Sequence, residues 1–215
     1  MSDTREGAAF ADLKVTLVDY GYGNIRSVAR ALTRAGVSPV ISGDPRELAN
    51  ADAAVVPGVG AADSAMKALE RLGLVSALGQ FIETGRPVLG VCLGQQLLMD
   101  WTEEGDIPCL GVVPGTAKRL PAGQKVPHMG WNSVEFVSPH PLLEGVPNPS
   151  YFYFVHSYYA QPDAESTVVG MTDYGVRFCS MLAKGNVAAT QFHPEKSGPL
   201  GLRMYANFVR LAAGG

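Results

Sequence analysis

Up to residue 91, the chain alternates between short apolar runs and longer stretches in which apolar residues recur at helical spacing. The apolar runs have the length and composition of buried strands, and they span residues 14–19, 37–41, 53–56 and 87–91. The helical patterns span residues 25–35, 61–71 and 74–84, and Asn24 stands where the first of them needs a capping residue. Strands separated by helices predict a parallel sheet covered on both faces, with a site at the carboxyl ends of its strands.

From residue 109 to residue 191, most of the chain consists of short β-type runs with glycine or proline between them. Such runs are typical of hairpins or of an antiparallel extension of a sheet. They span residues 111–113, 131–137, 151–159, 167–171, 178–182 and 187–191, and a helical pattern at 203–213 follows them. We therefore predict an α/β protein whose central, mostly parallel sheet is flanked by helices and extended by antiparallel strands.

The N-terminal stretch 1–12 is polar and carries three acidic residues. It has neither the basic start nor the apolar stretch of a signal peptide, so we predict a loose N-terminal tail. Residues 13–215 contain no linker, repeat or low-complexity tract, and we predict that they form a single domain.

Composition narrows the possible functions. A chain of 215 residues with 47% hydrophobic content can bury a full core. A net charge of −3 gives no sign of a nucleic-acid-binding surface, and no apolar run approaches the roughly 18 residues of a membrane span. The 3 cysteines are widely spaced and form no CxxC pair, which argues against a disulfide framework or a zinc site and favours the reducing cytoplasm. We expect no metal and no cofactor.

The stretch 90–96 (GVCLGQQ) places Cys92 between two glycines, after an apolar run and before the helical pattern 96–99. A strand that turns sharply into a helix lifts the side chain at the turn clear of the sheet, as in the nucleophile elbow of hydrolases. The helix start also favours the thiolate, which is the reactive form of cysteine. Cys92 is therefore the candidate nucleophile, although a lone cysteine at a strand end is more often a small core residue. Cys109 and Cys179 lie in apolar β-type runs with no flanking base, and we interpret them as inert.

A cysteine nucleophile needs a base, and the base needs a group that orients it. Among the 4 histidines, His193 ends a β-type run and has Glu195 two residues away. Pro194 stiffens the backbone between them, so both side chains can lie on one rim of the sheet. We predict that His193 moves the proton and that Glu195 orients the imidazole, although His-Pro-Glu is also a common turn signal. The other histidines are His140 in a turn-rich loop and His128 and His156 in strand-like runs, where they are structural or line a cleft.

The tetrahedral intermediate of such a reaction carries a negative charge that needs hydrogen-bond donors. The backbone N–H of Leu93 is one candidate, because it directly follows the nucleophile. The turn Pro57-Gly58-Val59-Gly60 lies after another predicted strand and supplies the second candidate, the N–H of Val59. By itself this turn reads most simply as a tight connection. Its occurrence together with the other two motifs, in an order that suits one sheet rim, favours a catalytic site.

These three motifs, at 57–60, 90–96 and 192–195, together resemble those of the class I, triad-type glutamine amidotransferases. The resemblance extends from residue 14 to the end of the chain and implies a flavodoxin-like fold. In that family the cysteine attacks the side-chain amide of glutamine, forms a glutamyl thioester and releases ammonia. Glutamine is thus the implied substrate.

Three longer motifs, at 19–28, 127–132 and 153–159, resemble those of the glutaminase subunits of imidazole glycerol phosphate synthases of histidine biosynthesis. The partner implied by this resemblance is a (β/α)₈ cyclase subunit, which receives the ammonia in a heterodimer. One departure follows the Pro-Gly-Val-Gly turn, where Ala61-Ala62 stands in place of a pair with an aromatic second residue. This departure concerns local packing, and the catalytic motifs are complete.

The resemblance also implies roles for further residues. Those implied to bind glutamine are Gly58, Gly60, Gln96, Ser157 and Tyr158. Those implied to face the cyclase are Asp19, Tyr20, Asn24, Trp131 and Lys196. Without the resemblance, the segment 19–24 is an ordinary glycine-rich turn, Trp131 and the aromatic run 151–159 are core, and Lys196 is a solvated lysine.

Ammonia is mostly protonated at neutral pH and is then no nucleophile, so a synthase gains by passing it through a dry path and by keeping the isolated glutaminase slow. We expect the turn 58–60 to act as the gate, because glycine tolerates a peptide flip that exchanges an N–H for a carbonyl at the oxyanion position. Two alternatives remain. One is an independent cysteine hydrolase of the γ-glutamyl hydrolase or deglycase type, and the other is a non-enzymatic scaffold that docks a partner through its β-rich half.

Overall fold

A computed structural model describes residues 10 and 12–214, and its centre is a single sheet of 13 strands. Five strands run parallel in the order β2-β1-β3-β4-β13. Their bounds are β1 Val15–Val18, β2 Val40–Ser42, β3 Ala53–Gly58, β4 Val88–Cys92 and β13 Val187–Thr190. β1, β3, β4 and β13 are buried along their whole length, as strands covered on both faces must be.

The rest of the sheet is mostly antiparallel and continues from β13 in the order β12-β10-β7-β5-β6, with β11, β8 and β9 branching from β12. These strands are β5 Met99–Thr102, β6 Ile107–Pro108, β7 Val113–Arg119, β8 His128–Phe136, β9 Ser150–His156, β10 Tyr158–Pro162, β11 Val168–Asp173 and β12 Arg177–Lys184. Among the described strands of this part, only β5 and β7 pair in parallel. The predicted α/β class, with a mostly parallel centre and an antiparallel extension, is confirmed.

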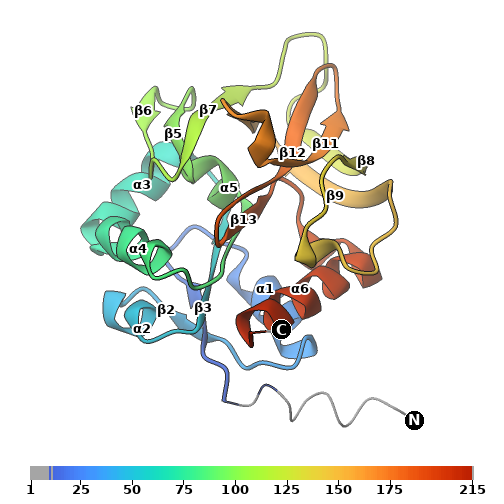
Figure 1. Cartoon of the computed structure of the whole chain (residues 1–215). Helices are drawn as coiled ribbons and strands as arrows, with labels where there is room; N and C mark the ends of the chain where they lie inside the picture. Colours follow the sequence, from blue (N-terminus) through green and yellow to red (C-terminus); the bar gives the residue numbers. More distant parts are fainter. Residues whose placement is uncertain (1–9, 11, 215) are drawn as a thin grey trace.

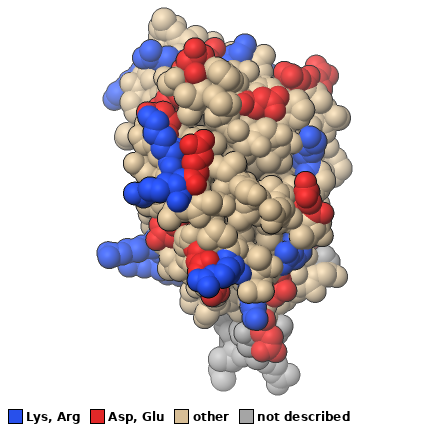
Figure 2. Space-filling view, turned by 90° about the vertical axis from the view of Figure 1, so that its left-hand side faces the viewer, with Lys and Arg blue, Asp and Glu red and all other residues tan. Residues whose placement is uncertain are grey.

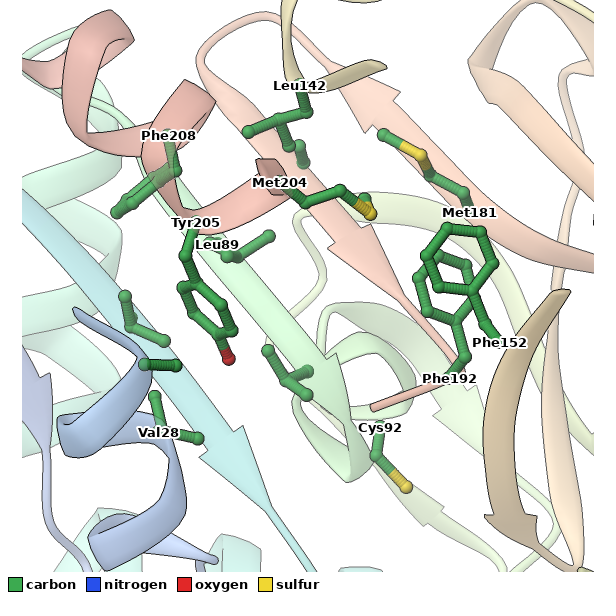
Figure 3. Close-up of a cluster of buried hydrophobic side chains, with 14 of the residues drawn as sticks. Val28, Leu89, Cys92, Leu142, Phe152, Met181, Phe192, Met204, Tyr205 and Phe208 are labelled. Carbon is green, nitrogen blue, oxygen red and sulfur yellow. The ribbon is translucent and has the colours of Figure 1, made fainter. Parts of the chain in front are cut away.

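Helices cover both faces of the parallel strands (Figure 1). The α-helices are α1 Ile25–Arg34, α2 Pro45–Ala49, α3 Ala62–Arg71, α4 Leu74–Glu83, α5 Leu93–Leu97 and α6 Gly198–Ala212. Short 3₁₀ turns are η2 Pro141–Leu143, η3 Glu165–Thr167 and η4 Pro194–Lys196. One core cluster joins α1 and α6 to the sheet, and a second joins α3 and α4 to its other face. Figure 3 shows the first cluster, with Cys92 at its edge.

Several predicted elements have different bounds in the structure. The strand expected at 37–41 is only Val40–Ser42, although Val37 is buried in the core. The helix after Cys92 ends at Leu97, because Met99 starts β5 and pairs with Val113. The run 151–159 is two strands, β9 and β10, since Ser157 interrupts it. The last helix starts at Gly198, before the predicted residue 203. These boundaries depend on pairing partners far away in the sequence.

The predicted tail 1–12 lies mostly outside the described residues. Of it, Phe10 packs partly buried against the core cluster of α1 and α6. No helix among the described residues has the length and apolar character required to traverse a lipid bilayer. Figure 2 shows the face on the left-hand side of Figure 1, where acidic and basic side chains are mixed. That face therefore carries no large field of one sign, in keeping with the net charge of −3.

Candidate active site

The candidate nucleophile lies at the junction of β4 and α5, at the carboxyl end of a central strand. Cys92 has a φ of 56°, which is uncommon outside glycine and occurs where surrounding structure enforces it. Its side chain is 5% exposed, and Figure 3 shows it projecting from the end of its strand. The structure thus contains the sharp strand-to-helix turn that the sequence predicts.

The turn is held by very close packing of α5 against β3. A Cβ on Gly94 would lie 2.0 Å from the backbone oxygen of Val56, so a side chain at this position would collide with the strand. A Cβ on Gly58 would lie 2.7 Å from both Leu93 Cβ and the Tyr20 hydroxyl. Glycine at 58 and 94 therefore lets the end of β3 and the start of α5 enclose the same small space.

His193 and Glu195 form a fully buried pair just after β13, the strand next to β4. His193 Nδ1 lies 2.7 Å from Glu195 Oε1. Two further side chains donate to this carboxylate, Asn24 Nδ2 at 3.3 Å to Oε1 and the Tyr205 hydroxyl at 3.5 Å to Oε2. Ser197 Oγ also donates to the His193 carbonyl, at 2.7 Å. Donors from the residue before α1 and from α6 thus hold the carboxylate that orients the imidazole.

The charges around His193 suit a proton carrier. Burial by itself lowers the pKa of His193, but the neighbouring Cys92 sulfur and the Glu195 carboxylate outweigh burial and raise the pKa above its usual range. With Nδ1 facing Glu195, the ring presents Nε2 to the nucleophile, and this buried atom has no hydrogen-bond partner among the described residues. A protonated imidazole beside the sulfur is the arrangement that activates a cysteine nucleophile.

A cavity of about 290 Å³ opens beside Cys92. Its lining includes Val59, Gly60, Leu93, Gln96, Glu104, Ser157 and Tyr158. Gln96 Nε2 donates to the Tyr158 carbonyl at 2.8 Å and to Gln191 Oε1 at 3.0 Å. Gln191 Nε2 in turn lies 3.6 Å from the Cys92 sulfur. The structure therefore brings the predicted nucleophile and most of the predicted glutamine-binding residues to one cavity.

The two backbone N–H groups predicted to bind the oxyanion differ in whether they already have an acceptor within the protein. Leu93 is the first residue of α5, where a backbone N–H has no acceptor within its own helix. The N–H of Val59 instead donates to the Tyr22 carbonyl at 3.2 Å. Gly60, with a φ of 99°, lies in the left-handed region directly after it. In this conformation one of the two donors is therefore turned away from the oxyanion position.

The other two cysteines have no such surroundings. Burial raises the pKa of Cys109 to about 11 and that of Cys179 to about 12, which favours the unreactive thiol. All three cysteines are free thiols. Among the residues that the structure describes, no group of three or more His, Cys, Asp or Glu side chains could hold a metal ion.

The family model of the class-I glutamine amidotransferases matches residues 16–212. The imidazole glycerol phosphate synthase subunit HisH of Dehalococcoides mccartyi strain CBDB1 is 47% identical over 201 residues, which cover 93% of this chain and 98% of that one. The HisH subunit of Moorella thermoacetica is 48% identical over 198 residues, covering 92% and 94%. The chain belongs to the HisH group of class-I glutamine amidotransferases. The resemblance inferred from the motifs is thus confirmed.

The fold of this class-I amidotransferase also matches solved structures. A crystal structure of a glutamine amidotransferase superimposes with a TM-score of 0.74 at 23% identity and covers 93% of this chain and 98% of that chain. The structure of PurLQS from Thermotoga maritima gives a TM-score of 0.75 at 17% identity, with the same coverage. At these identities the likeness concerns the fold alone.

Two residues that the motifs assign to the partner surface of this amidotransferase have other contacts. Tyr20 is only 3% exposed, and its hydroxyl donates to the Pro57 carbonyl at 2.7 Å. Its side chain is buried behind the turn after β3, so its prediction as a docking residue is wrong. Asn24 precedes α1 but forms no side-chain cap, because its amide donates to Glu195 instead. Its prediction as a helix cap is therefore wrong.

The remaining residues predicted to face the cyclase lie at or near the surface. Trp131 is 57% exposed, and its ring meets that of Tyr153 edge-on at 6.2 Å between centroids. Lys196 is exposed and holds its ammonium 5.8 Å from the centroid of the same Tyr153 ring. Asp19 is half-buried and accepts from the N–H of Gly21 at 3.0 Å. Trp131 and Lys196 thus share one aromatic neighbour.

Three site residues of this amidotransferase were not found from its sequence, namely Glu104, Gln191 and Tyr205. Glu104 lines the cavity and accepts from the N–H of Ala62 at 2.8 Å, where the chain departs from the family pattern. Gln191 ends a predicted β-type run, and its position two residues before His193 was the available signal. Tyr205 has the spacing of an ordinary core residue of α6, and nothing in the sequence separates it from its neighbours.

Proposed function

We propose that this chain is the glutaminase subunit of an imidazole glycerol phosphate synthase, which hydrolyses glutamine to glutamate and ammonia and delivers the ammonia to a (β/α)₈ cyclase subunit. The observation that carries the proposal is that Cys92 and Gln96 line the same cavity, and that Cys92 acts on the buried His193, which is bonded to Glu195. HisH relatives at 46–48% identity over more than nine-tenths of the chain support the same activity.

The proposed reaction begins at the Cys92 sulfur. His193 takes the thiol proton, and the thiolate attacks the side-chain amide carbon of glutamine to form a carbon–sulfur bond. His193 then returns the proton to the nitrogen as the carbon–nitrogen bond breaks, which releases ammonia and leaves a glutamyl thioester on Cys92. Water attacks the thioester with His193 as base, glutamate leaves, and the sulfur regains its starting state. Glu195 keeps Nδ1 occupied so that Nε2 performs every transfer.

The cavity suits the amino-acid end of glutamine. Gln96, Ser157 and Tyr158 line it with amide, hydroxyl and backbone groups, and so does Gly60, whereas the predicted binding residue Gly58 is not among the lining residues and packs against Leu93 and Tyr20. We propose in addition that the Glu104 carboxylate pairs with the α-ammonium group of glutamine. Glu104 is the one carboxylate among the residues that line the cavity, and burial raises its pKa. A bound ammonium group would offset that cost of burial.

The turn after β3 supports a partner-dependent activity. The N–H of Val59 bonds to the Tyr22 carbonyl and not toward the cavity, so the oxyanion site lacks one donor in the free chain. We propose that docking of the cyclase favours the flipped peptide, in which this N–H turns toward the substrate. Such a gate keeps the isolated subunit from hydrolysing glutamine to no purpose. It also favours the synthase over the alternative of an independent cysteine hydrolase.

We propose that the cyclase docks where Asp19, Asn24, Trp131 and Lys196 lie near the catalytic rim, and that ammonia crosses there without meeting bulk water. We also propose a cytoplasmic location, because all three cysteines are free thiols and reducing compartments keep them so. Residues 13–215 are proposed to fold as one domain, since one sheet joins both halves of the chain.

The substitution Cys92→Ala tests the proposed function in the complex with the cyclase. We expect glutamine-dependent synthesis of imidazole glycerol phosphate to disappear, because no thioester can form. Synthesis from added ammonium salts at high pH should continue at the wild-type rate, since the cyclase is intact. Cys179→Ala serves as the control and should retain both activities. Loss of both activities in Cys92→Ala would mean that Cys92 is structural and would contradict the proposal.

A further inference from the structure

A pair of buried histidines lies behind the glutamine cavity and takes no part in the proposed reaction. His128 on β8 and His156 on β9 are register partners, and their side chains point to the buried face of this strand pair. His128 Nδ1 and His156 Nε2 lie 2.9 Å apart. The ring of Tyr174 stacks on His128 at 3.8 Å between centroids, so aromatic surfaces hold the pair in place. His156 also lines the cavity.

The hydrogen bonds fix the tautomer of each ring. His156 Nδ1 lies 2.9 Å from the Tyr158 carbonyl, which can only accept, so Nδ1 of His156 carries the proton. Its Nε2 is then an acceptor when the ring is neutral, and His128 Nδ1 must donate to it. His128 Nε2 in turn accepts from Asn132 Nδ2 at 3.3 Å. Every proton in the series Asn132, His128 and His156 therefore points toward the Tyr158 carbonyl.

Both histidine rings are neutral at physiological pH, so each hydrogen bond in the series keeps the donor and acceptor described above. Burial lowers the pKa of His128 to about 4 and that of His156 to about 3. His128 and His193 further lower the pKa of His156. The one opposing influence is the bond to the Tyr158 carbonyl, which favours the proton already placed on Nδ1.

The series continues from the Tyr158 carbonyl to the nucleophile. The same carbonyl accepts from Gln96 Nε2 at 2.8 Å, and Gln96 directs its second amide hydrogen to Gln191 Oε1 at 3.0 Å. Gln191 Nε2 reaches the Cys92 sulfur at 3.6 Å. Both amide hydrogens of Gln96 are thus committed to protein acceptors, which fixes the direction in which its oxygen points. The Tyr158 carbonyl is the junction between the histidine pair and the side chain that binds substrate.

We propose that His156, held by His128, is a positioning residue for glutamine binding, because it fixes the Tyr158 carbonyl against which the Gln96 amide is oriented. This inference rests on the proposed glutaminase function. Without the donor on His156, the Tyr158 peptide can tilt and the Gln96 amide can rotate, so its oxygen no longer points steadily at the substrate. The KM for glutamine rises, while the Cys92 thiolate and His193 keep their own geometry.

Two nearly isosteric substitutions of His156 separate positioning from general structure. In His156→Asn the amide nitrogen takes the place of Nδ1 and can still donate to the Tyr158 carbonyl. In His156→Gln the amide takes the place of Nε2, so it faces His128 and the donor to Tyr158 is lost. We expect a KM for glutamine about tenfold above wild type in His156→Gln, the effect of one buried hydrogen bond. In His156→Asn the KM for glutamine should rise less than about threefold, because the donor to Tyr158 is kept.

These assays use the complex with the cyclase, and ammonium-dependent synthesis reports whether each variant is folded and assembled. The Gln96→Ala background supplies the second test. If His156 acts through Gln96, His156→Gln should change the KM there by less than about twofold. Equal KM values for the Asn and Gln variants, or an undiminished effect in the Gln96→Ala background, would overturn the inference. Absence of glutaminase activity in the wild-type complex would instead overturn the proposed function.

Discussion

Three buried histidines lie close together in this protein, and their surroundings drive their pKa values in opposite directions. His193 faces the Cys92 sulfur and the Glu195 carboxylate, which raise its pKa against the effect of burial. His128 and His156 face each other and uncharged groups, so burial lowers both pKa values. The role of His193 could be predicted from the sequence, because a carboxylate, Glu195, lies two residues away. The pairing of His128 with His156 depends on the register of β8 and β9, which no local pattern reveals.

The protonation states can be read by NMR of imidazole nitrogens. We expect His193 to stay protonated at pH values where free histidine has lost its proton, because its raised pKa means that the proton leaves only as pH rises further. His128 and His156 should appear neutral, with the proton on Nδ1, down to about pH 5.

The substitution Cys92→Ala removes one of the two groups that raise the pKa of His193, so that pKa should fall. Cys179→Ala is the control, because this second buried thiol is not among the groups that act on His193. The pKa of His193 should therefore not change in Cys179→Ala. A His193 that titrates like free histidine in the wild-type protein would contradict a protonated imidazole beside the nucleophile.

At the scale of elements, the site depends on two turns, the elbow after β4 and the glycine-rich turn after β3. The sequence predicted both, because glycine and cysteine at these spacings have strong local preferences. It could not predict that α5 stops at Leu97, since this end is imposed by the pairing of Met99 with Val113. Nor could it predict the Asn24 contact with Glu195, which joins residues 171 positions apart. Local sequence patterns predict the turns, whereas contacts between distant residues determine where α5 ends and which side chains hold Glu195.

The proposed gate makes a prediction about the turn after β3. Val59→Pro has no N–H to turn toward the oxyanion, so glutamine hydrolysis in the complex should fall by about 10²–10³ in kcat. Val59→Ala keeps the N–H and is the matched control, and it should lose far less activity. Ammonium-dependent synthesis should be unaffected in both variants. If Val59→Pro in the complex hydrolysed glutamine as fast as wild type, the gate would have to be abandoned.

At the scale of the whole molecule, the hairpin of β8 and β9 has two different faces. Its inner face carries His128 and His156, next to the cavity. Its outer face exposes large apolar side chains, with Met129 61% exposed, Trp131 57% and Tyr151 62%. Exposed apolar clusters of this kind are typical of partner surfaces. The motifs pointed to Trp131, whereas Met129 and Tyr151 became candidates only once the strand pairing placed them on the same face.

This arrangement gives the molecule a simple division. The parallel strands β3, β4 and β13 lead to the glycine-rich turn, to Cys92 and to His193. The alternating pattern predicted β3 and β4 in the parallel sheet, but it assigned 187–191 to the antiparallel extension. That assignment is wrong, because β13 pairs in parallel with β4. The antiparallel extension supplies the cavity wall at residues 155–158 and the outward apolar face. Which residues of the extension line the cavity and which face outward depends on register, and sequence patterns do not specify register between distant strands.

The central claim is that the Cys92 sulfur carries a glutamyl group during the reaction. The most direct measurement is to quench the complex with acid during turnover of glutamine labelled in its carbon skeleton, and to locate the label by peptide mapping. We expect the label on the peptide that contains Cys92, removable by hydroxylamine as a thioester is, and absent in Cys92→Ala. Label on a different residue, or wild-type glutamate formation from the Cys92→Ala complex, would contradict the account.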